Sequence, residues 1–189
     1  MKRHLLVTND YPPKVGGIQS YLWELWKRLP EEKVTVFTPD HADARIFDVE
    51  QGHSIVRDKR KVFFPTRSLA ADIRDLARKV DAELVVLDPA LPLGHLAPSL
   101  DLPYAVIVHG AEVALPGRLP ITKQLLRRVL LGAEFVITAG GYPAAEAVRA
   151  ANRPIETIVI PPGVDGSRFA PLGSPAVIEQ KRGELGLGD

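Results

Sequence analysis

Two adjacent glycines, Gly16 and Gly17, stand where one apolar run ends and an apolar helix begins. The run 4–9 (HLLVTN) is typical of a buried strand, and the apolar spacing over 17–29 predicts a helix. Glycine lets another group approach the backbone closely, and the first turn of a helix has N–H groups that bind anions. The pair therefore indicates a site for a phosphorylated ligand, with a plain tight turn as the alternative.

The residues around this junction add polar side chains. Asn9, Asp10 and Tyr11 follow the strand directly, and Gln19 falls in the first turn of the predicted helix. In open α/β sheets ligands bind beyond the carboxyl ends of the strands, so we treat all four as candidate ligand-binding residues. For Gln19 the simpler alternative is a residue on the solvent face of the helix.

A histidine ends another buried run. His109 comes directly after the apolar segment in 103–110 (PYAVIVHG), and Glu112 follows three residues later. A histidine at a strand end can donate or accept a hydrogen bond in a cleft, and Glu112 could orient it or bind a sugar hydroxyl. A purely structural histidine is the competing interpretation.

Several chemistries lack their usual residues. The sequence has no G-x-G-x-x-G after the first strand, no G-x-S-x-G, no D-x-D and no H-E-x-x-H, which disfavours a dinucleotide cofactor, a hydrolase nucleophile and a metal site. It has no cysteine, and its net charge of +1 argues against a nucleic-acid binder. No run is long enough for a signal peptide or a membrane span, so we expect a cytoplasmic protein.

Two basic stretches are candidates for contact with an anionic membrane. The stretch 57–65 places its positive charges beside two phenylalanines, and 117–131 mixes basic residues with leucines in a helical pattern. Packing of the apolar face on the sheet, with solvated charges, is the alternative. The candidate lipid-contact residues are Arg57, Lys59, Arg60, Lys61, Arg118, Lys123, Arg127 and Arg128.

Short apolar runs alternate with helical patterns along the chain. Continuous Val, Ile and Leu runs are typical of strands that are buried on both faces. The pattern predicts an α/β protein with a doubly wound, mostly parallel, Rossmann-like sheet of seven strands. The expected strands are 4–9, 33–39, 53–58, 83–88, 103–110, 134–140 and 156–162, and the expected helices are 17–29, 67–80, 92–99, 118–131 and 142–151.

The last residues are polar and contain no further strand pattern. We expect a domain over 1–170 and, over 171–189, the start of a linker toward a domain that lies outside this sequence; an ordinary C-terminal helix is the alternative.

Three motifs together resemble a known family. VTNDYPPKVGGIQSYLWEL, VHGAEV and IPPGVDGSRFAP occur in this order at predicted strand ends. They resemble the N-terminal, acceptor-binding half of retaining GT-B glycosyltransferases of family 4, and most closely the phosphatidylinositol mannosyltransferases of actinobacteria. The resemblance covers about residues 1–172.

The resemblance implies a role for each candidate. Gly16 and Gly17 would face the donor's diphosphate and sugar, and His109 would contact the transferred sugar and stabilise developing positive charge. Asn9, Asp10, Tyr11, Gln19 and Glu112 would bind the acceptor or a sugar. The donor, GDP-mannose in the nearest relatives, would be bound mainly by a C-terminal domain, with no cofactor or metal, and this chain by itself would be inactive.

The acceptor stays open at this point. A phosphatidylinositol mannoside at the inner face of the plasma membrane is the first reading, and a soluble sugar, a sugar phosphate or another lipid is the second. A non-enzymatic α/β module that binds a phosphorylated ligand is a reading from another class. Two segments depart from the family pattern: 138–147 (TAGGYPAAEA) has glycines in place of a serine-containing stretch, and 39–52 has no counterpart.

Overall fold

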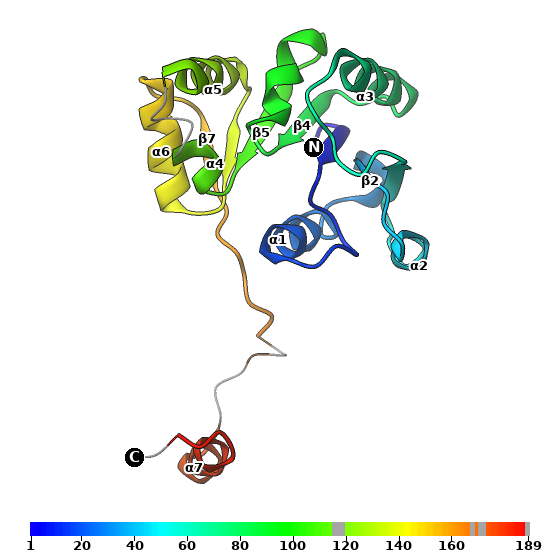
Figure 1. Cartoon of the computed structure of the whole chain (residues 1–189). Coiled ribbons are helices and arrows are strands. Elements are labelled where there is room, and N and C mark those ends of the chain that lie inside the picture. The colour runs from blue at the N-terminus through cyan, green and yellow to red at the C-terminus, as the bar shows by residue number, and fades with distance from the viewer. Residues whose placement is uncertain (115–119, 167–168, 170–172, 188–189) are drawn as a thin grey trace.

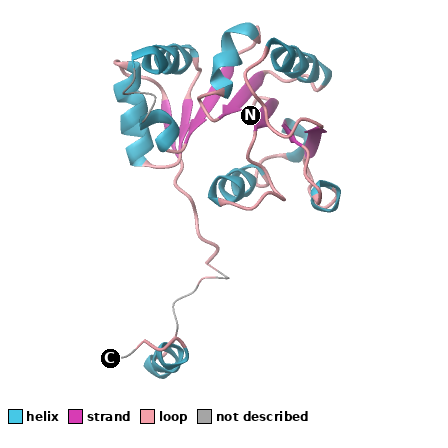
Figure 2. Ribbon diagram, viewed as in Figure 1, coloured by secondary structure: helices cyan, strands magenta, loops and turns pink. Residues whose placement is uncertain are grey.

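A seven-stranded sheet organises the chain. The structure is a computed structural model that describes residues 1–114, 120–166, 169 and 173–187. The order across the sheet is β3-β2-β1-β4-β5-β6-β7, and every pairing is parallel (Figures 1 and 2). The strands are β1 His4–Thr8, β2 Val34–Pro39, β3 Ser54–Asp58, β4 Leu84–Asp88, β5 Tyr104–Val108, β6 Val136–Thr138 and β7 Thr157–Val159.

Helices and 3-10 turns connect these strands. They are α1 Gly17–Trp26, η1 Glu31–Lys33, α2 Ala44–Asp48, α3 Arg67–Lys79, η2 Leu93–Ser99, α4 Ala111–Ala114, α5 Pro120–Gly132, α6 Gly141–Ala151 and α7 Pro175–Glu184. Figure 1 shows α1 on one side of the sheet and α3 and α5 on the other. The sheet is therefore doubly wound, as the sequence predicts.

The direction of winding reverses between β1 and β4. From β1 the chain moves outward to β2 and β3, then returns and builds β4 to β7 on the other side of β1. In such sheets the carboxyl ends of the strands on either side of the reversal border a crevice where ligands bind. Thr8 and Asp88 end these two strands and are in register with one another.

The central strands are buried on both faces. All five residues of β1, β4 and β5 are buried. Leu5 and Val7 belong to the apolar cluster under α3, η2 and α5, whereas Leu6 belongs to the cluster under α1. Their apolar side chains thus bind helix layers on both faces, which is why these strands appear in sequence as unbroken apolar runs.

The helix beginnings differ in a way that concerns function. Thr66 caps α3 by accepting a hydrogen bond from the Leu69 amide. At α1 the preceding residue is Gly16, which offers no side-chain cap. The first N–H groups of α1 are therefore left without this common partner, as an anion site requires.

The structure corrects several expected boundaries. The sheet is entirely parallel, and the strands at its β7 end are shorter than predicted: 134–140 holds the three-residue β6, and 156–162 holds the three-residue β7. The segment 39–52, which has no counterpart in the family pattern, contains α2, a single turn that buries only Ala44. Such a short helix leaves almost no apolar period in the sequence to detect.

The C-terminal segment has no buried residue along α7 (Figure 1). The expected boundary at 170 remains a prediction. Over the described residues no helix combines the length and apolar character needed to cross a bilayer.

Candidate active site

Thr8 and Asp88 are joined by a hydrogen bond across the reversal of the sheet. The Thr8 hydroxyl donates to Asp88 Oδ2 over 2.6 Å, and Thr8 Oγ1 also accepts the Asp10 amide at 2.8 Å. Asp88 is fully buried, so the hydrogen bond from Thr8 and one more supply its polar partners. The strand ends are thereby fixed at the point where a ligand crevice is expected.

The second hydrogen-bond partner of Asp88 is the candidate histidine. His109 Nε2 lies 2.6 Å from Asp88 Oδ1, and its side chain is 12% exposed against 1% for Asp88. A carboxylate is an acceptor only, so Nε2–H donates to it. The Tyr21 ring of α1 meets the imidazole edge-on, with centroids 5.6 Å apart. His109 is therefore held from two sides.

Burial controls the protonation of this group. Desolvation raises the pKa of Asp88, and the hydrogen bonds from His109 and Thr8 oppose that rise. Burial, together with the nearby Asp88 charge, raises the pKa of Tyr21 to about 12, so its hydroxyl stays protonated and donates to the Ile160 carbonyl at 2.8 Å.

A second network supports the glycine loop. Asp10 Oδ1 accepts hydrogen bonds from Gln19 Nε2 at 2.5 Å and from Lys14 Nζ at 2.6 Å. Gln19 is only 7% exposed, so it is not the solvent-facing residue of the simpler alternative. Its side chain lies against Gly16, where an added Cβ would overlap Gln19 Oε1. A side chain at position 16 would therefore displace the Gln19 amide from its present position.

Replacing Gly16 with alanine is expected to break the Gln19–Asp10 hydrogen bond without unfolding the chain. We expect a loss of about 1–2 kcal/mol of stability and a shifted Gln19 side-chain amide signal in a ¹H–¹⁵N spectrum. Gly17→Ala is the matched control, since nothing lies within 4 Å of a Cβ there. Equal effects of the two substitutions would contradict the close-approach argument.

Asn9 and Tyr11 are used inside the protein. Asn9 exchanges two hydrogen bonds with the Phe63 backbone, at 3.1 and 2.6 Å, and so holds the loop 59–66. The Tyr11 hydroxyl lies 2.7 Å from His53 Nε2, and its ring is buried. The structure therefore gives both residues supporting contacts, and any ligand contact they make remains a prediction.

The residue that orients His109 is one the sequence reasoning missed. Glu112 was the candidate, but its side chain lies outside the described residues, and Asp88 occupies the orienting position. A signal was present, because an acidic residue ends the apolar run LVVLD. Among the described residues, no group of three or more His, Cys, Asp and Glu side chains is arranged as a metal site.

The basic candidates separate into bound and unbound side chains. Arg57 is mostly buried, pairs with Asp48 and donates to the Pro12 and Pro39 carbonyls, so we remove it from the lipid-contact set. Arg60 pairs with Asp58 and Asp72, and Arg127 donates to the Ala151 carbonyl at 3.1 Å. The residues left without a partner in the described part are Lys59, Lys61, Lys123 and Arg128, while Arg118 lies outside it.

A groove of about 580 Å³ adjoins the site. Gly17, Ser20 and Tyr21 line it from α1, and the segment 161–165 lines it from the other side. The start of α1 therefore opens onto space large enough for a ligand of moderate size.

Comparison with known proteins gives consistent results. The matching family model is described as Glycosyltransferase Family 4 and covers residues 15–168. A curated relative from Mycobacterium tuberculosis, a GDP-mannose-dependent alpha-(1-6)-phosphatidylinositol monomannoside mannosyltransferase, is 36% identical over 98% of this chain and 51% of its own. A Corynebacterium glutamicum enzyme, described as acting on the monoacylated form of that acceptor, is 29% identical over 100% of this chain and 50% of its own. The chain spans about half the length of these relatives.

Solved structures share the fold at low sequence identity. HepE from Anabaena, in complex with UDP and glucose, has a TM-score of 0.68 at 18% identity and covers 98% of this chain and 50% of its own. Sucrose-phosphate synthase from Thermosynechococcus elongatus has a TM-score of 0.65 at 17% identity and covers 100% and 53%. The sheet is the one found in the N-terminal half of GT-B glycosyltransferases. Because the family model matches well over half of its residues, the chain belongs to glycosyltransferase family 4.

Proposed function

We propose that this chain is the acceptor-binding half of a retaining mannosyltransferase that transfers mannose from GDP-mannose to a phosphatidylinositol mannoside-type lipid. Its similarity to the two mannosyltransferases extends over nearly all of its residues, which supports a shared donor and acceptor class. The partner half, which would bind most of the nucleotide sugar, would be a second α/β domain. The residues 171–189 would begin the connection to it.

The observation that carries the proposal is the group formed by Thr8, Asp88 and His109 beside the uncapped start of α1. As the bond from the sugar to the diphosphate breaks, positive charge develops on the sugar and negative charge on the diphosphate. The N–H groups at Gly16 and Gly17 would stabilise the negative charge. His109, held by Asp88, would contact the sugar.

Neither a cofactor nor a metal is part of the proposal. The nucleotide sugar is a substrate, and basic residues of the partner half would bind its diphosphate. Lys59, Lys61, Lys123 and Arg128 would contribute peripheral contact with anionic lipid at the inner face of the membrane. A lipid acceptor requires such contact, whereas a soluble acceptor does not.

A transfer assay tests donor and acceptor together. The protein translated from the complete reading frame is incubated with radiolabelled GDP-mannose or UDP-glucose, and with phosphatidylinositol monomannoside or free mannose. We expect labelled lipid only from GDP-mannose with the lipid acceptor. The 189-residue chain, as the control, is expected to give negligible transfer. Product from UDP-glucose, product on free mannose, or turnover by the 189-residue chain would each overturn a named part of the proposal.

A further inference from the structure

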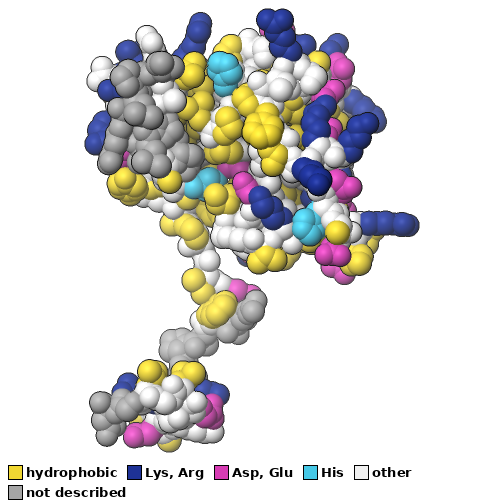
Figure 3. All heavy atoms as spheres, viewed as in Figure 1, with side chains coloured by type: hydrophobic (Ala, Val, Ile, Leu, Met, Phe, Trp, Pro, Cys, Tyr) yellow, Lys and Arg dark blue, Asp and Glu magenta, His cyan; other side chains and the backbone are white. Residues whose placement is uncertain are grey.

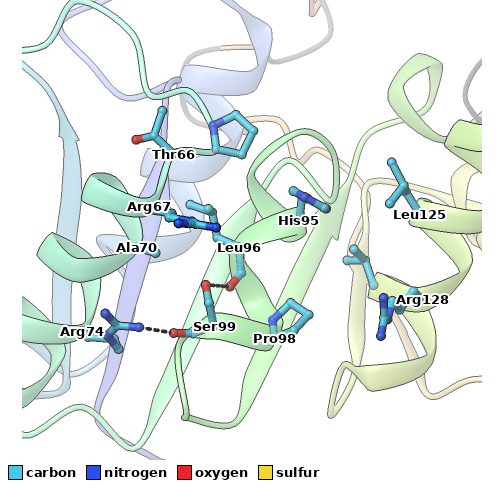
Figure 4. Close-up of a pocket in the computed structure, with 12 residues that line it drawn as sticks. Thr66, Arg67, Ala70, Arg74, His95, Leu96, Pro98, Ser99, Leu125 and Arg128 are labelled. Atoms are coloured by element: carbon cyan, nitrogen blue, oxygen red, sulfur yellow. Dashed lines mark hydrogen bonds between the residues drawn. The ribbon is translucent and has the colours of Figure 1, made fainter.

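A second groove lies on the opposite face of the sheet from α1. It has a volume of about 570 Å³ and runs between α3, η2 and α5 (Figure 4). Its buried floor residues, Ala70, Leu96 and Val129, belong to the apolar cluster of that face, whereas Tyr21 and Tyr11 belong to the other cluster. The groove is therefore separate from the candidate active site.

Helical spacing explains why positive charges border an apolar floor. On α3, Arg67, Ala70 and Arg74 are three and seven residues apart and so share one face. The small side chain of Ala70 between two arginines keeps the floor open. On α5, the lining residues are one cation, Arg128, and two apolar residues, Leu125 and Val129.

The cations at the rim are not equivalent. Arg74 donates to the Ser99 carbonyl at 2.6 Å, which ties α3 to η2 (Figure 4). Arg67 and Arg128 are exposed and have no hydrogen-bond or ion-pair partner among the described residues. Among the described residues that line the groove there is no Asp or Glu. Two unpaired arginine side chains, one from α3 and one from α5, thus border an apolar floor (Figure 4).

This combination favours an anion that carries an apolar body. Guanidinium groups bind phosphate through paired N–H donors, and the floor would bury hydrocarbon. A volume of about 570 Å³ is typical of a small-molecule site. Figure 3 shows hydrophobic side chains between α5 and α3, with Lys and Arg gathered toward the α3 and α2 end.

We propose that this groove binds one anionic phospholipid, with its phosphate between Arg67 and Arg128 and its glycerol and first acyl carbons on Ala70, Leu96 and Val129. This goes beyond the proposed function, because the site lies on the other face of the sheet and uses neither the donor nor His109. Such a site would bind single anionic lipid molecules. The lysines in the lipid-contact set would instead be attracted only by the negative charge of a membrane surface.

The test is a titration of the ¹⁵N-labelled 189-residue chain with dihexanoyl phosphatidylglycerol, a soluble lipid, below its micelle concentration. We expect amide shifts confined to the groove, around Arg67, Ala70, Leu96 and Arg128. Dihexanoyl phosphatidylcholine and inorganic phosphate are expected to bind roughly tenfold more weakly, because one is neutral overall and the other lacks the apolar body.

Substitutions locate the binding. Arg67→Gln with Arg128→Gln is expected to weaken binding of the anionic lipid at least about tenfold, since two charge-assisted contacts are lost. Lys79→Gln removes a charge from the same helix outside the groove and is expected to leave the affinity unchanged. All three residues are exposed, so the variants are expected to keep the fold.

Four outcomes would overturn the proposal. They are shifts spread over the whole basic surface, equal affinity for phosphatidylcholine, equal affinity for inorganic phosphate, and an equal effect of Lys79→Gln. The first would indicate surface charge alone, and the third a free-phosphate site. Because no sugar donor is present, failure here is distinct from failure of the mannosyl transfer assay.

Discussion

Replacing His109 with alanine is expected to lower the mannosyl transfer rate about 100- to 1,000-fold in the protein translated from the complete reading frame, with GDP-mannose as donor. The imidazole is held 2.6 Å from a buried carboxylate, so it is ready to stabilise charge without reorganising during the reaction. Single-turnover transfer at saturating donor is the measurement. A rate within a factor of three of the unmodified protein would remove His109 from the catalytic role.

The substitution Asp88→Asn keeps the shape of the side chain at position 88 but changes how it orients His109. The amide is nearly isosteric, and its oxygen can still accept the Thr8 hydrogen bond, but its uncharged –NH2 group cannot accept a hydrogen bond from His109 Nε2. As a positioning residue, Asp88 is expected to contribute less than His109, with a fall of roughly 10- to 100-fold. A variant with the same transfer rate and the same pH profile as the unmodified protein would show that the carboxylate serves only to fill space.

The same substitution is expected to change how the stability of the fold depends on pH. Since burial raises the pKa of Asp88, the native state holds this proton more tightly than the unfolded chain does. That contribution to stability is complete below the ordinary aspartate pKa of about 4 and is lost as the pH rises through the raised value. We therefore expect Asp88→Asn to gain stability relative to the unmodified chain as the pH rises from about 4 toward neutrality. Urea unfolding across that range measures the difference.

Phe63→Ala is expected to cost about 3–5 kcal/mol of unfolding free energy, the largest stability effect among these predictions. The Phe63 side chain is fully buried and packs against Phe37, with ring centroids 4.8 Å apart. Its backbone also carries both hydrogen bonds to Asn9, next to the glycine loop. Removing the ring leaves a cavity and frees the loop that follows β3.

The neighbouring Phe64→Ala supplies a matched control. Phe64 has the same side chain but is 66% exposed, so its removal is expected to change stability by less than about 0.5 kcal/mol. Thermal unfolding of both variants gives the comparison, at roughly 2–4 °C per kcal/mol for a chain of this size. Equal losses in the two variants would mean that Phe63 does not anchor this loop.

Much of the fold follows from local pattern. Unbroken apolar runs such as LVVLD and YAVIV predict strands buried on both faces, and their alternation with helical segments predicts a doubly wound parallel sheet. The central strands are found close to the predicted residues. The lengths of the strands at the β7 end are overestimated. The apolar residues there continue beyond the paired part of each strand into a loop, and the sequence pattern does not distinguish the two.

Which side chains form hydrogen bonds and ion pairs was harder to predict from the sequence. The basic stretch 57–65 reads as an exposed charge cluster, yet Arg57 is enclosed by Asp48 and two proline carbonyls. Those partners come from segments 9, 18 and 45 residues away. Local composition carries no information about such distant groups, so an internal arginine and a surface arginine look alike in the sequence.

The sequence by itself determined the layered class, the glycine junction at the start of the first helix and the histidine at a strand end. These features depend on local spacing, which a single chain displays directly. Only the tertiary structure decided that Asp88, 21 residues before His109 and 80 after Thr8, orients the imidazole. It also decided that arginines of α3 and α5 share a groove. Both depend on strand order and helix packing, which bring together residues at sequence separations that follow no regular spacing.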